Sequence, residues 1–537
     1  MTFAIPKQLT SLNSLVTPTV LDVELNDTDI DRMITKILEM AVKRGRSAGS
    51  RVDTRDYVGY LEKLQNSPHL IGFKGERGRD VLDGWVRSSV LKEEKVGLRR
   101  DKVQMGYLRP LTIAAYRSGL PKTASRNRRA DSLIYRSMER VLARGGGQNT
   151  SAQVERLFIE TFGRGVDVGI SPWGSPCYDG ETEVDIDTLL ALRFLEGFTG
   201  NVKLTKLRDP LDPPVPQAVD PLGEDLVNFL RVYGPKMPVA EAYSHVSALI
   251  ALRLFQLPLV TARSVRAILT GDEPLGAGNP SELYCDFVKR RGGASDELSR
   301  MCVIRDLEIT RTFFGDRLLL RSLGEAVDVL PARASLGDTA EQKLRSLAAL
   351  KDSDEMQIAL RMQMKSVYAA LENGSDGRAF IEEMEASDLS AADQLTEVLV
   401  EGLRKRGLEN QVKWYWSTGA IDKPYGVLAG AKRSRASWRY SPTDECLTTL
   451  LCMCFVEADG QRTSSRLPIR TVLDRLRERF GILIDKPPSE LDSADARSGA
   501  AANLIAFTRQ LQLLGCFQGL SDDFNAQFVT RPREATA

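Results

Sequence analysis

The chain has 537 residues, of which 42% are hydrophobic and 27% charged, and its 73 basic side chains almost balance its 72 acidic ones. This composition excludes a disordered or fibrous chain and a protein that coats nucleic acid over its whole surface, while the length predicts three or four domains. With no readable secretory signal in the first twenty residues and no apolar run of membrane-spanning length, we expect a soluble cytoplasmic protein without a membrane partner.

Helical patterns dominate the first predicted domain, residues 1–206. Apolar residues recur at three-and-four spacing after Asp27, which is typical of one buried helix face. Two further patterns end at glycines, Gly145 and Gly163, and the second opens with a Ser/Thr cap. A fourth helix is expected from Asp185 to Phe198.

A basic segment, 92–144, lies inside this domain. It holds fourteen Lys or Arg residues and five acids, and such a concentration on a neutral protein creates a local field that attracts phosphates. Arg126, Arg128 and Arg129 are the candidate nucleic-acid contacts. A solvated helix surface explains the same charges, and the sequence leaves both interpretations open.

Five carboxylates alternate over residues 179–187 and could share a divalent metal on a strand. They are Asp179, Glu181, Glu183, Asp185 and Asp187. A solvated loop leading into a helix explains the cluster better, so a metal-dependent nuclease is only the last of three functional hypotheses.

The middle of the chain is divided by proline. Residues 207–223 contain five prolines, which predict an irregular linker and a domain boundary. Helical periods return over 224–335, a middle helical domain. Residues 336–410, rich in strong helix formers, are expected to form a bundle segment of three or four helices.

The segment 411–440 combines aromatic and basic residues. It holds three of the five tryptophans and six basic residues against one acid, and its glycines and Pro424 predict short strands and turns. Cationic groups bind phosphates and an aromatic ring can stack on an unpaired base. The candidate nucleic-acid residues here are Lys432, Arg433, Arg435, Trp438 and Arg439. In the alternative, the tryptophans face the core and only the basic residues meet phosphate, and this mixed interpretation is favoured.

The last predicted domain, 441–537, has the pattern of three helices and a hairpin, with Ser441 as the first cap and a second helix from Pro468. This order resembles winged-helix domains, whose third helix often enters the DNA major groove. That helix carries only Arg497 and Arg509, a poor set for reading bases, and winged helices with apolar faces often bind proteins.

The fold class predicted from these patterns is mainly α, a multidomain helical protein with a small β-containing segment and a C-terminal winged-helix-like domain. The stretches SPTDECLTTLLCMCF, LPIRTVLDRLRERFGILID and NLIAFTRQLQLLGCFQGLSDDFNAQFV resemble the ends of uncharacterised accessory proteins from bacterial multi-gene anti-phage defence islands. The resemblance implies a subunit without chemistry of its own that helps partner proteins hold DNA.

Few residues suit catalysis. The chain has two histidines, His69 in a loop and His245 in an apolar helix, and no paired metal-ligand motif. Cys446, Cys452 and Cys454 lack C-x2-C spacing and are interpreted as buried thiols. Phosphate-binding loops and a nucleophile elbow are missing from the sequence as well, so no catalytic residue, metal or cofactor is assigned.

The leading hypothesis is therefore a non-catalytic DNA-binding or assembly subunit of a prokaryotic defence or DNA-processing complex, with non-specific DNA and other subunits as partners. A protein–protein scaffold without nucleic-acid binding is the alternative.

Overall fold

The computed structural model places helices over most of the chain that it describes. The described residues are 3–9, 11–12, 14–46, 61–62, 65–66, 71–85, 91–95, 103–108, 113, 128–167, 177–184, 209–272, 281–328, 330, 336–457, 460–462, 465–519 and 527–532. The predicted fold class, a mainly α multidomain protein, is confirmed, whereas the domain boundaries stay predictions.

The N-terminal part is built from short helices and two-stranded sheets. Three predicted helices are confirmed, and the helix predicted over 185–198 lies outside the described residues. The elements are α1 (Ile30–Val42), α3 (Gly75–Trp85), β1 (Leu91–Lys95), β2 (Val103–Leu108), α5 (Ala130–Arg144), α6 (Thr150–Phe162), β3 (Val166–Asp167) and β4 (Cys177–Tyr178). Strand β1 pairs with β2 and β3 with β4, both antiparallel. Helices α5 and α6 end at Gly145 and Gly163 as predicted, but α6 begins after Asn149, whose side chain makes no capping bond.

The prediction of an irregular linker over 207–223 is wrong for the second half of that range, which forms the start of α8 (Pro216–Val232). Pro216 occupies the first turn, where a missing amide hydrogen costs nothing and the fixed dihedral favours the helix. Pro221 lies inside the helix, where packing of α8 against α5 and α9 offsets the lost hydrogen bond. The irregular part is therefore shorter than predicted.

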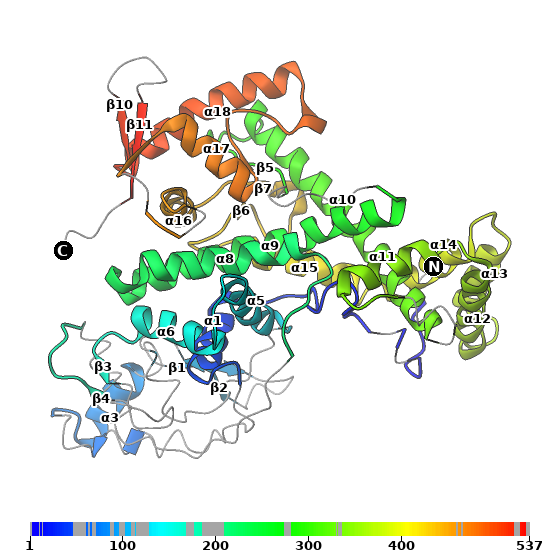
Figure 1. The fold of residues 1–537 in the computed structure, drawn as a ribbon, viewed down its shortest axis with the longest axis horizontal. Helices are drawn as coiled ribbons and strands as arrows, with labels where there is room; N and C mark the ends of the chain where they lie inside the picture. Colours follow the sequence, from blue (N-terminus) through cyan, green and yellow to red (C-terminus); the bar gives the residue numbers. More distant parts are fainter. Residues whose placement is uncertain are drawn as a thin grey trace.

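Two long helices form the centre of the molecule, α9 (Val239–Thr270) and α10 (Ala294–Val327). Helix α9 is long and apolar enough to cross a membrane, but its apolar window is entirely buried by protein, as in a core helix. Figure 1 shows α9 and α8 running through the middle, with the N-terminal part on one side and the C-terminal part on the other.

Residues 340–403 form four helices at one end of the molecule, the upper number expected (Figure 1). They are α11 (Ala340–Leu350), α12 (Asp354–Ala370), α13 (Asp376–Glu385) and α14 (Ala391–Leu403). Thr339 and Gln342 form a reciprocal capping box at α11, and Ser353 and Ser390 cap α12 and α14. Local capping thus defines where the bundle helices start.

An N-terminal strap, formed by the described residues 3–9, 11–12 and 14–21, crosses from this bundle to the N-terminal part. The Ile5 amide donates to the Gly402 carbonyl at 3.4 Å. Two buried arginines of α10 bind strap carbonyls: Arg321 donates to Leu12 at 2.7 Å and Arg317 donates to Leu15. The strap therefore supplies the hydrogen-bond acceptors that these buried cations need.

The prediction of strands around the first two tryptophans of segment 411–440 is wrong. Trp414 and Trp416 lie in a helix, α15 (Leu408–Thr418), and only two-residue strands follow. Strand β6 (Leu428–Ala429) pairs antiparallel with β7 (Arg439–Tyr440), and the 3-10 turn η4 (Arg435–Ser437) lies between them.

The C-terminal part has the expected three helices and a hairpin. Its elements are α16 (Asp444–Cys454), β8 (Arg466–Pro468), α17 (Ile469–Phe480), β9 (Ile482–Leu483), α18 (Ala494–Leu513), β10 (Phe517–Gly519) and β11 (Gln527–Thr530). The cap of α16 is Thr443 rather than Ser441. Strands β10, β11 and β8 form one antiparallel sheet, while β9 pairs in parallel with β5 (Leu283–Tyr284) of the central region. The remaining short turns are η2 (Gly234–Lys236) and η5 (Ser489–Leu491).

Candidate functional site

Three of the predicted nucleic-acid residues lie together on one loop, residues 430–437, which we call the basic loop. Lys432, Arg433 and Arg435 are exposed there. The loop is closed at its base by the β6–β7 pair and internally by the Ala431 amide, which donates to Ser437 Oγ at 2.9 Å. The cations therefore project from a loop whose backbone is fixed by hydrogen bonds.

Trp438 anchors the basic loop from below. Its ring is 1% exposed and stacks on Tyr415 with centroids 5.9 Å apart and planes 10° apart. Its indole N–H donates to the Ala431 carbonyl at 2.9 Å. The ring is inaccessible to a base, so the assignment of Trp438 as a stacking residue is corrected to that of a core residue, and Trp414 is equally buried.

The basic residues of segment 411–440 differ in whether they form ion pairs within the molecule. Arg439 is half-buried, with Nε 3.4 Å from the carboxylate of Asp296. Lys432 lies 5.3 Å from the centroid of the Trp416 ring and 3.7 Å from Asp422. Arg433 and Arg435 have no ion pair within the described part of the chain. These two guanidinium groups are the ones left for an external anion.

The other predicted cluster is separate and largely neutralised. Arg126 lies outside the described residues. Arg128 pairs with Glu24 at 2.9 Å and Asp27 at 3.3 Å, and Arg129 pairs with Asp22. Acidic residues that precede α1 thus pair with Arg128 and Arg129, which the sequence predicted to bind phosphate.

Two arginines of the basic segment that lie on α5 are also neutralised by ion pairs within the molecule. Arg140 pairs with Asp220 at 3.0 Å and donates to the Leu211 carbonyl at 3.2 Å. Arg144 also pairs with Asp220, at 3.0 Å. These residues attach α5 to the start of α8, so their charges are balanced inside the molecule.

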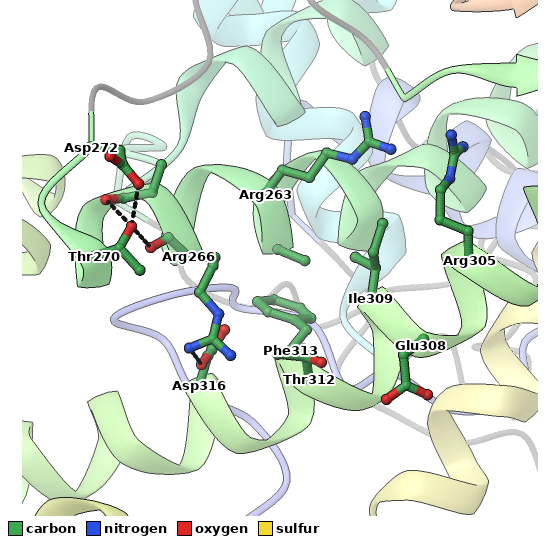
Figure 2. A pocket seen from close by; sticks show the side chains of 12 residues that line it. Arg263, Arg266, Thr270, Asp272, Arg305, Glu308, Ile309, Thr312, Phe313 and Asp316 are labelled. Carbon is green, nitrogen blue, oxygen red and sulfur yellow. Dashed lines mark hydrogen bonds and ion pairs between the residues drawn. The ribbon is translucent and has the colours of Figure 1, made fainter. Parts of the chain in front are cut away.

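A pocket of about 660 Å³ lies between the C-terminal half of α9 and the middle of α10 (Figure 2). It was missed because its residues come from two segments about forty positions apart, and no local motif connects them. Arg263, Arg266 and Thr270 follow one face of α9, and Ile309 and Phe313 follow one face of α10. Only the helical spacing of these residues could have indicated a shared surface.

A buried carboxylate, Asp306, lies behind the pocket. Arg305 Nε donates to its Oδ1 at 2.9 Å, and the Tyr440 hydroxyl donates to its Oδ2 at 2.6 Å. Burial raises the pKa of Asp306, although the charge and hydrogen bond of Arg305 oppose this rise. The same carboxylate therefore connects the pocket wall to the base of the basic loop.

Comparison with protein-family models identifies the family to which this chain belongs. The model described as "Methylation-associated defense system protein MAD7" matches residues 10–533. The chain belongs to the MAD7 family. It is thus a component of a methylation-associated defence system, and the predicted resemblance to anti-phage defence proteins is confirmed. No curated protein matches the chain.

The acidic cluster of this MAD7-family chain does not form a metal centre in the part that the structure describes. Asp179 Oδ1 accepts the amides of Glu181 and Thr182, each at 3.0 Å, so it closes a turn. Its pKa is lowered by the hydrogen bonds of Thr182, the side-chain one above all. Asp185 and Asp187 lie outside the described residues.

Three cysteines of the MAD7-family chain, Cys446, Cys452 and Cys454, and the imidazole of His245 are buried, as predicted. Burial raises the pKa of Cys446, Cys452 and Cys454 to about 12, so these thiols are protonated at neutral pH. His245 Nδ1 lies 2.7 Å from Thr449 Oγ1, and burial lowers the pKa of His245 to about 4. His69 lies outside the described residues.

A second buried ion cluster joins three helices. Asp225 of α8 accepts Arg253 Nε of α9 at 2.7 Å and Arg479 Nε of α17 at 2.8 Å. Its pKa is lowered, because the charges of the two arginines outweigh the effect of burial. The cluster fixes the C-terminal part of this MAD7-family protein on the central helices.

Proposed function

We propose that this MAD7-family protein is a non-catalytic, cytoplasmic subunit that binds DNA through its phosphates. The observation that supports this proposal most strongly is the basic loop. Arg433 and Arg435 are exposed there on a backbone fixed by hydrogen bonds, and they have no ion pair among the described residues. Lys432 adds a third cation beside them. Since phosphates carry no sequence information, such binding is non-specific.

We test this with the affinity of the purified chain for duplex DNA over a salt series. Three phosphate contacts predict that log affinity falls against log salt with a slope of about −2.7. The double variant Arg433→Gln, Arg435→Gln should make this slope shallower by about 2, because each lost contact removes roughly one released counterion. Fluorescence anisotropy with a labelled duplex measures both.

The matched control is Arg345→Gln on α11, an exposed arginine that pairs with Glu341 at 2.9 Å. Its slope should equal that of the unaltered chain. An unchanged slope in the double variant, or no binding at low salt, contradicts the proposed DNA contact.

A second candidate function is protein assembly, and α18 favours it. We propose that residues 441–532 are a winged-helix domain, with α16, β8, α17, α18, β10 and β11 in the matching order. In that case α18 takes the place of the groove-reading helix. Its exposed face instead presents Ile505 and Leu513, each 74% exposed, with Ala501 and Arg509 at the same four-residue spacing.

This face is poorly suited to base edges. Arg497 is occupied by Asp492, whose carboxylate accepts two hydrogen bonds at 2.7 and 2.6 Å. The two exposed apolar side chains, Ile505 and Leu513, suit a protein partner, for which we propose another component of the same defence system.

Ile505→Asp should abolish copurification of that component, since a charge cannot be buried in an apolar contact without a partner. Ile358→Asp on α12, a 59% exposed position, is the control. Pull-down from cells that express the whole system measures the effect. Equal recovery of the component with both variants rejects the α18 interface.

A further inference from the structure

The pocket between α9 and α10 has two arginines at one end, Arg263 and Arg305. Arg263 Nη2 and Arg305 Nε face the same oxygen of Asp306, Oδ1, at 4.0 and 2.9 Å. Two guanidinium groups thus share one buried carboxylate at this end. Figure 2 shows both side chains extending past the same end of the pocket.

The two arginines differ in how far their donors are used. Arg305 also donates to the Glu282 carbonyl at 2.5 Å, and its Nη1 lies 3.7 Å from the exposed carboxylate of Glu490. Arg263 has only the 4.0 Å approach to Asp306, which is beyond hydrogen-bond distance, and no hydrogen bond within the described part of the chain. Its side chain is 21% exposed and lines the pocket, so its N–H groups remain available to a bound anion.

The remaining charges of the pocket are already engaged or point outward. Arg266 pairs with Asp316 at 3.2 Å, and Thr270 donates to Asp272 at 2.6 Å. Glu308 is exposed at the rim, where Figure 2 shows it turned away from the other labelled side chains. Arg263 is therefore the group that an incoming anion would meet.

Apart from Thr312, the rest of the lining is apolar. Ala262 and Ala267 of α9 face Ile309 and Phe313 of α10 across the pocket. A volume of about 660 Å³ lies within the usual range of small-molecule sites, which combine apolar walls with a few polar groups. Guanidinium groups bind carboxylates and phosphates through paired N–H donors.

We propose that this pocket binds a small organic anion, in which one phosphate or carboxylate is attached to a flat apolar body. The anionic group accepts hydrogen bonds from Arg263, and the apolar body lies between Ala267 and Ile309. This proposal does not require DNA binding by the basic loop or protein binding by the α18 face.

Isothermal titration calorimetry of the full chain tests the site with three anions: adenosine monophosphate, phenyl phosphate and benzoate. At least one should bind, tenfold or more tightly than adenosine, which lacks the anion, and inorganic phosphate, which lacks the apolar body. The preferred anion then distinguishes phosphate from carboxylate and a nucleotide from a simple aromatic.

Arg263→Gln should weaken this binding at least tenfold, while Arg311→Gln, an exposed arginine on the same helix as Ile309, should leave it unchanged. Ala267→Phe fills the pocket without altering charge and should also prevent binding. Thermal unfolding of each variant confirms that it is folded. Binding of none of the three anions, or binding by Arg263→Gln and Ala267→Phe as tight as that of the unaltered chain, overturns the proposal.

Discussion

Asp225→Ala should lower the free energy of unfolding by about 3–5 kcal/mol, the usual result of removing one partner from a buried ion cluster. The carboxylate is 2% exposed, Arg253 is 6% exposed and Arg479 is 21% exposed, so two largely buried guanidinium groups would lose their counterion. Urea unfolding followed by tryptophan fluorescence measures the change.

The pH dependence of this contribution has a definite sign. The pKa of Asp225 is lower in the folded chain than in the unfolded one, so the unfolded state binds the proton more readily. The stabilisation is therefore complete above the unfolded pKa of about 3.9 and is lost as the pH falls through the folded pKa. The difference in stability between the unaltered chain and Asp225→Ala should shrink accordingly in acid.

Asp474→Ala is the control, because Asp474 and Arg477 form a partly exposed pair at 2.7 Å. Such pairs contribute about 0–1 kcal/mol. If Asp225→Ala were no more destabilising than Asp474→Ala, the cluster between α8, α9 and α17 would have no structural importance.

Trp438→Ala should destabilise the chain by about 3–5 kcal/mol, since it empties a core site of the largest side chain. The substitution removes the stacking on Tyr415 and the hydrogen bond to Ala431 that closes the basic loop. Trp438→Phe should cost less because it keeps an aromatic ring on Tyr415. Urea unfolding and DNA anisotropy should be measured on the same samples.

The two measurements separate a core tryptophan from a base-stacking one. Trp416→Ala is the comparison, because Trp416 is only partly buried beneath Lys432. A base-stacking Trp438 would show unchanged stability in Trp438→Ala with reduced DNA affinity. That outcome would contradict the buried position described for the ring.

Amphipathic periodicity was enough to predict the helices, because a buried stripe at three-and-four spacing leaves few other structures. The same rule failed at Trp414–Trp416, where alternating aromatics beside several glycines indicated strands. A helix places Trp414, Tyr415 and Thr418 on its buried face, and the glycines begin only at its end, Gly419. The glycines that follow this helix therefore led to a wrong prediction of strands within it.

The sites depended on information that local sequence lacks. Exposure of Arg433 and Arg435 was predictable from their position in a polar stretch that follows Gly430. The neutralisation of Arg128 and Arg129 was not, because their carboxylate partners lie about a hundred residues earlier. The pocket at Arg263 likewise exists only once two long helices cross.

The N-terminal strap sets an order for folding during synthesis. Leu12 and its partner Arg321 are separated by 309 positions, so the ribosome must complete more than half of the protein before the strap can dock. Closing so long a loop is entropically costly and slow. Until then the carbonyls of Leu12 and Leu15 have no arginine to bind, and nascent chains that stall before this point would expose an incomplete core to chaperones and proteases.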